Sequence, residues 1–168
     1  MYTAGGDAPS CNATIRRMTS LVRRFLKTAI LFLVAGLAIG GWMIVDRERS
    51  GRLASSYATS AHTHAILVGF VMMMILGVAL WMFPRPVKGD VRYSPRLAEA
   101  AYWMLTAGTA VRVVGELLHS RSDATWLRYT VIVAGLMQIA GLLTFFATMW
   151  SRIRGVGSQA REEAGERF

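Results

Sequence analysis

The chain contains an uninterrupted apolar stretch that begins at a pair of histidines and ends before a proline. From His62 it runs through about 19 almost wholly apolar residues to Phe83, and Pro84 follows. A stretch of this length without charge can cross the hydrocarbon core of a bilayer as one helix. His62 and His64 lie at one mouth of that helix, where ionisable side chains are costly unless they have partners. We therefore expect the function of the chain to depend on these two imidazoles.

Three further stretches have the same apolar character. Of the 168 residues, 54% are hydrophobic, and the charged residues gather in short clusters between apolar runs. The sequence therefore predicts an all-α fold, an integral membrane four-helix bundle. The expected spans are residues 28–45, 62–83, 97–118 and 127–150 of a membrane domain covering residues 21–152. Residues 1–20 and 153–168 are expected to be flexible tails.

The Lys and Arg residues predict how this bundle is oriented. The net charge is +9, and the basic residues lie at the ends of apolar runs, which is typical of topology determinants and lipid-headgroup contacts and not of a nucleic-acid surface. Thirteen of them flank the spans on the side of the termini, against five in the other two loops. The positive-inside rule then puts both termini in the cytoplasm of a multi-pass protein of a bacterial-type inner membrane. His62, His64 and His119 all fall at the outer end.

The two neighbouring histidines are the first candidate ligands. On a regular helix, side chains two positions apart diverge by about 200°, so His62 and His64 are not expected to bind one metal together. One is expected to face the bundle as a ligand, while the other faces a loop, a partner chain or the headgroups. Neutral imidazole is a common metal ligand and a standard axial ligand of haem. The alternative is an interfacial imidazole that only bonds backbone or water.

Arg112 and Glu116 are the two charges within the predicted span cores. A charge there costs roughly 2.5–3.5 kcal/mol on insertion scales. One interpretation is a self-neutralising i, i+4 pair inside the bundle. In the other, the Arg112 guanidinium binds an anionic cofactor group such as a haem propionate, and Glu116 serves a proton or quinone site. The sequence leaves both open.

Two stretches resemble a known family. H-T-H-A-I-L-V-G-F from His62, followed by G-V-A-L-W-M-F-P, resembles the second helix of subunit I of the haem–copper oxidase and nitric-oxide reductase superfamily. Y-W-M-L-T-A-G-T-A-V-R-V-V-G-E looks like the next helix of short oxidase-subunit-I-like proteins. The resemblance covers about residues 28–150, the first four of that family's helices. It implies a histidine axial ligand of a low-spin haem: H-T-x-A fits His62, H-A-I-L fits His64, and we favour His64.

The same resemblance limits the expected function. In the family, the other haem and copper ligands come from later helices, so we expect this chain not to be an oxidase on its own. We expect a membrane protein that binds haem b for electron transfer or for binding NO or O2, with respiratory redox partners or quinol as possible partners. The second axial ligand would come from His119, from the other histidine of the pair, or from another copy in a homo-oligomer such as a homodimer. A small-residue face of Gly36, Gly40 and Gly41 would let another helix approach closely.

Two further classes of protein remain as alternatives. One is a copper or zinc binding membrane protein in which His62 and His64 capture the metal. The other is a structural accessory subunit of a respiratory complex, whose histidines contact headgroups or neighbouring subunits. Covalent c-type haem is excluded because it needs a C-x-x-C-H signal, and Cys11 is the single cysteine.

Overall fold

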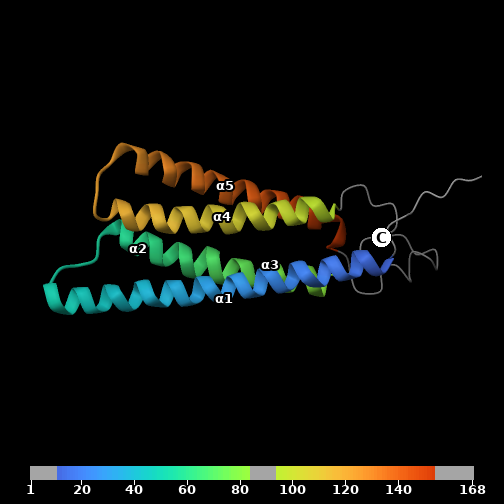
Figure 1. Cartoon of the computed structure of the whole chain (residues 1–168), viewed down its shortest axis with the longest axis horizontal. Coiled ribbons are helices and arrows are strands. Elements are labelled where there is room, and N and C mark those ends of the chain that lie inside the picture. The colour runs from blue at the N-terminus through green and yellow to red at the C-terminus, as the bar shows by residue number, and fades with distance from the viewer. Residues whose placement is uncertain (1–10, 84–93, 154–168) are drawn as a thin grey trace, which may run out of the picture.

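The chain folds into two helical hairpins that lie side by side (Figure 1). The structure is a computed structural model, and it describes residues 11–83 and 94–153. In the first hairpin, helix α1 (Cys11–Ser50) pairs with a composite helix of three segments, α2 (Ser56–Thr63), the π-helix η1 (His64–Met72) and α3 (Met73–Met82). In the second, α4 (Pro95–His119) pairs with α5 (Thr125–Met149), which a short 3-10 turn, η2 (Trp150–Arg152), extends. These two ranges contain no strand, so the all-α prediction is confirmed for them.

Local sequence signals explain where the helices of the first hairpin end and begin. Gly51 ends α1 with φ +65°, and its N–H bonds the carbonyl of Arg47 at 2.9 Å, which is a glycine C-terminal cap. The Ser55 hydroxyl accepts a backbone N–H of the first turn of α2 at 3.2 Å. At the far end, Phe83 is extended because the residue before a proline, here Pro84, is pushed out of the helical region.

The helices cover the predicted spans except for Phe83, and most of them begin before the predicted start. α1 begins at Cys11, inside the range 1–20 predicted as a flexible tail, whereas residues 1–10 and 154–168 of the predicted tails lie outside the described residues. Three helices are long and apolar enough to cross a membrane: Ser20–Ser50, Ser56–Met82 and Thr125–Met149. α4 is not among them, since Arg112 and Glu116 lower the hydropathy of its second half, although its 25 residues give it sufficient length.

The packed core lies toward the end of the bundle where α1 begins and α5 ends (Figure 1). The fully buried ring of Phe25 meets Tyr102 edge-on at 5.0 Å and Phe145 at 5.9 Å. Buried Arg152 donates to the carbonyl of Leu80 at 3.1 Å, which ties the end of the second hairpin to α3. Aromatic packing and this bond fix one end of the bundle, and the three histidines lie at the other.

The outward faces of the helices remain apolar. Leu31 on α1 is 69% exposed, and Val133 and Leu143 on α5 are 63% and 65% exposed. Within the most apolar window of α1, 11% of the residues are buried inside the protein. Contiguous apolar surface of this extent marks a contact with a membrane or a partner. The combination of long apolar helices and apolar outward faces is typical of a membrane protein.

Candidate functional site

His62 lies against α1, where glycines bring the two helices close together. Its Nδ1 is 2.9 Å from the carbonyl oxygen of Gly36, so Nδ1–H donates this bond and Nε2 retains its lone pair. A Cβ at Gly40 would lie 2.9 Å from Cε1 of the ring, so a side chain there would displace the imidazole. The glycine face predicted to admit another helix therefore admits the chain's own second helix.

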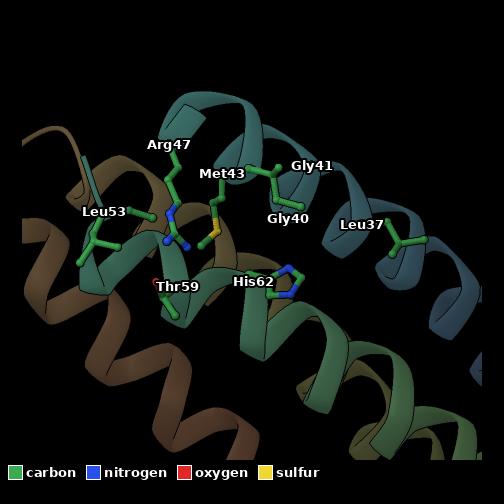
Figure 2. Close-up of a pocket in the computed structure, with 10 residues that line it drawn as sticks. Leu37, Gly40, Gly41, Met43, Arg47, Leu53, Thr59 and His62 are labelled. Atoms are coloured by element: carbon green, nitrogen blue, oxygen red, sulfur yellow. The ribbon is translucent and has the colours of Figure 1, made fainter. Parts of the chain in front are cut away.

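A cavity of about 740 Å³ opens beside His62, between α1, the loop that follows it and α2 (Figure 2). Small-molecule sites typically enclose roughly 300–1,000 Å³. In Figure 2 the side chains of Met43 and Arg47 reach from α1 toward α2, and the His62 ring lies below Gly40. The lining is mostly apolar and consists of Leu37, Gly40, Gly41, Met43, Ile44, Arg47, Leu53, Ala54, Thr59 and His62. It combines one imidazole, one guanidinium and one thioether with an aliphatic wall.

His64 faces the opposite way, toward α4, and joins a polar cluster around Glu116. Its Nδ1 is 2.8 Å from the carbonyl of Ser60 and 3.1 Å from Oε2 of Glu116. The Ser60 hydroxyl donates to Oε1 of the same carboxylate at 2.9 Å. The Glu116 side chain is 3% exposed and that of His64 is 21% exposed. The carboxylate is therefore held by two partners from α2 and η1 across the helix interface.

Arg112 completes this cluster and extends it to α5. Its Nε donates to Oε1 of Glu116 at 3.1 Å, and its Nη1 donates to the side-chain oxygen of Gln138 at 3.1 Å. The Gln138 amide then donates to the hydroxyl of Thr109 at 2.9 Å. A Cβ at Gly135 would lie 2.9 Å from Nη1 of Arg112, so the glycine leaves room for the guanidinium. Arg112 and Glu116 therefore form the self-neutralising pair, which is the first of the two interpretations that the sequence left open.

His119 lies in a third environment, and it neither lines the cavity nor bonds the cluster around Glu116. It is 4% exposed, and its ring stacks on Tyr57 at 4.0 Å between centroids with an angle of 11° between planes. Its Nδ1 is 3.7 Å from Oδ1 of exposed Asp123, and neither ring nitrogen has a hydrogen-bond partner within the described part of the chain. The ring therefore packs as an aromatic plate at the end of α4.

The three candidate histidines share one end of the bundle but not one site. His62 bonds α1, His64 bonds α4, and His119 stacks on α2. This agrees with the expected divergence of His62 and His64. Across residues 11–83 and 94–153, no group of three or more His, Cys, Asp or Glu side chains is arranged to hold a metal ion. A shared copper or zinc site of the histidines therefore has no geometric support in these ranges.

Two features of the site are not among the sequence predictions. The helix widens to π geometry from His64 to Met72, and π segments are rare and frequent at functional sites. The other feature is the stripe of Gly40, Met43 and Arg47 on α1. These positions follow the i, i+3, i+7 spacing of one helix face. That spacing is the sequence signal from which this stripe could have been predicted.

The fold and the site define an α-helical protein with long apolar spans, a histidine-lined cavity and a buried ionic cluster at one end. Residues 10–154 match the family described as Domain of unknown function (DUF8744), and the chain belongs to that family. No curated protein and no solved structure matches the chain. The resemblance to oxidase subunit I thus rests on the quoted residues alone.

Proposed function

We propose that this protein crosses a membrane four times and binds one b-type haem in the cavity between α1 and α2, with Nε2 of His62 as an axial ligand. The observation that carries the proposal is the setting of His62: Nδ1 is bonded to the Gly36 carbonyl at 2.9 Å beside a cavity of about 740 Å³. A backbone carbonyl on Nδ1 fixes the tautomer and leaves Nε2 for the metal, as in many metal-binding histidines. This geometry favours His62 over His64.

The residues of the cavity fit a haem in three respects. Its aliphatic wall suits an apolar macrocycle, and its volume lies within the range of cofactor sites. Arg47 supplies the cation for a propionate, the role that the sequence offered for Arg112. A haem carries its own equatorial ligands, so it needs axial side chains and no cluster of three ligands. Bound haem would supply one-electron chemistry or binding of a diatomic gas, while the bond from His62 to Gly36 orients the imidazole.

The membrane part of the proposal rests on the apolar outer faces and on the three helices that are long enough to cross. We assign α4 as the fourth span because the two charges in its second half are paired inside the bundle, where Arg112 and Glu116 bond each other at 3.1 Å. Pairing of this kind lowers the cost of charges at membrane depth. The basic residues near the termini then orient the histidine end outward, away from the cytoplasm.

Haem binding is tested by titrating the detergent-purified apoprotein with hemin. We expect a Soret band that saturates at one haem per chain, with parallel quenching of tryptophan fluorescence because Trp42 neighbours the cavity-lining Gly41. The variant Gly41→Trp tests whether haem occupies the cavity. It places a large side chain at a cavity wall where a Cβ would meet nothing within 4 Å. It should fold and lose the Soret band. Titration of the wild type with no defined end point would contradict the proposal and leave a structural subunit as the interpretation.

The orientation is tested by labelling of single cysteines. In a Cys11→Ser background, Asp123→Cys creates a thiol in the loop between α4 and α5, where the Asp123 side chain is 88% exposed. We expect this thiol to react with an impermeant maleimide added outside spheroplasts. Reaction only after the membrane is permeabilised would reverse the assigned orientation.

A further inference from the structure

We propose that a groove between α1 and α4 binds one anionic phospholipid, with the Arg121 guanidinium on its phosphate and an acyl chain along the apolar walls. This inference rests on the membrane crossing in the proposed function and not on the haem. Two observations carry it. The groove is closed toward the centre of the bundle and open to the outside, and the cation at its mouth has no anionic partner within the described residues.

The groove has a volume of about 390 Å³ and lies between the second half of α1 and the end of α4 (Figure 1). Ile39 and Leu117 form its floor, because both line the groove and pack on a buried cluster behind it. That cluster consists of Ala61, Ala65 and Val113. The floor therefore separates the groove from the centre of the bundle, so its occupant enters from the surrounding medium.

The outer walls of the groove are apolar and exposed. Trp42 of α1 is 40% exposed and Leu118 of α4 is 48% exposed. Around a membrane-spanning bundle this medium is lipid hydrocarbon, so an acyl chain is the apolar group that reaches these walls. Leu118 also lines a second apolar groove of about 310 Å³, between α4 and α5. Two grooves that share one wall suit a ligand with two acyl chains.

Arg121 supplies the cation at the mouth of the groove. Its guanidinium carbon lies 5.7 Å from the centroid of the Trp42 ring, a cation–π distance. Within residues 11–83 and 94–153 the Arg121 side chain has no ion pair and no hydrogen bond. The neighbouring Ser120 hydroxyl already donates to the Leu117 carbonyl at 2.6 Å. The N–H donors of Arg121, together with the indole N–H of Trp42, are therefore the side-chain donors that face a ligand headgroup.

The chemistry of this mouth selects an anionic phospholipid. A guanidinium binds a phosphate group through two parallel N–H···O bonds. The phosphate of phosphatidylglycerol is the only charge of that headgroup, whereas phosphatidylcholine adds an ammonium group that the Arg121 cation repels. A free phosphate ion would use the guanidinium and leave the apolar walls without a partner, while a phospholipid uses both. In the orientation proposed above, this lipid lies in the outer leaflet.

Native mass spectrometry of the detergent-purified full chain, titrated with phosphatidylglycerol, measures the lipid retained per chain. We expect one tightly bound lipid in the wild type and an affinity about tenfold weaker in Arg121→Gln, which loses the charge-assisted bonds. The matched control is Arg128→Gln. Arg128 is an exposed arginine at the start of α5 that does not line the groove, so this variant loses the same charge and should bind like the wild type.

A second pair of variants tests the apolar part of the site. Ala38 lines the groove and is exposed, so Ala38→Phe should fill the groove without disturbing the core and should abolish retention of the lipid. Ala35, one turn earlier on α1, is also exposed and lies outside the groove. Ala35→Phe should retain the lipid. Circular dichroism checks that all four variants are folded.

The outcomes separate this inference from the haem. Equal affinities of Arg121→Gln and Arg128→Gln, or lipid retained by Ala38→Phe, would overturn the lipid site. Equal binding of phosphatidylcholine, or displacement of the lipid by excess inorganic phosphate, would overturn it as a site for an anionic phospholipid. The measurement uses apoprotein, so retention by a chain that binds no hemin would support the lipid site while the haem proposal fails. A chain found in the soluble fraction of the cell would overturn both.

Discussion

Replacing Glu116 by leucine is expected to destabilise the protein by about 3–5 kcal/mol, the usual cost of removing one partner from a buried ionic pair. The carboxylate is 3% exposed and accepts bonds from Arg112, Ser60 and His64. In the variant, the Arg112 guanidinium still donates to Gln138, but the carboxylate that neutralised its charge is gone. The measurement is the free energy of unfolding in mixed micelles, followed by circular dichroism.

Two further variants test whether the loss of stability in Glu116→Leu comes from the unpaired charge of Arg112. Glu99→Leu on the same helix removes a pair with Arg24 at 2.8 Å whose side chains are 50% and 48% exposed, and it should cost at most about 1 kcal/mol. The double variant Glu116→Leu with Arg112→Met should recover most of the lost stability, because it leaves no buried charge without a partner. Equal effects of Glu116→Leu and Glu99→Leu would contradict the role assigned to the cluster.

Replacing His62 by alanine is expected to weaken hemin binding by about 100-fold or more, which corresponds to at least about 2.7 kcal/mol. The reason is that the variant loses both the axial Nε2 and the bond from Nδ1 to the Gly36 carbonyl that orients the ring. His64→Ala should retain the haem spectrum, because His64 bonds Glu116 and faces α4. The measurement is the Soret titration of both variants under the conditions used for the wild type.

A chemical rescue separates ligation by His62 from packing. In His62→Gly, added imidazole should restore the Soret band, since the small ligand can occupy the space left by the side chain. Loss of the band in His64→Ala with retention in His62→Ala would instead move the ligand to His64, the residue favoured by the sequence.

The helices could be predicted because their signals are local. Apolar runs of bilayer length and the proline after Phe83 can be read directly from the sequence, and the helices agree with the predicted segments except at Phe83. The i, i+4 spacing also predicted the contact of Arg112 with Glu116. The start of α1 at Cys11 was not predicted, because the segment before Arg16 has the composition of a tail.

The settings of the histidines could not be predicted, because they depend on which helix faces meet. The bond from His62 to Gly36 joins positions 26 residues apart, and that from His64 to Glu116 joins positions 52 apart. Periodicity shows that the two rings diverge, but it does not say what each one meets. The bond from Arg112 to Gln138 likewise joins two helices, between positions 26 residues apart.

Whether this chain carries a b-type haem on His62 is decided by the reduced-minus-oxidised absorption spectrum of the purified wild-type protein. The protein should be expressed with a haem precursor and purified in detergent without added hemin. We expect sharp α and β bands and a Soret shift on reduction, at about one haem per chain by pyridine haemochrome assay. A protein that is colourless, although circular dichroism shows that it is folded, would contradict haem binding by this chain.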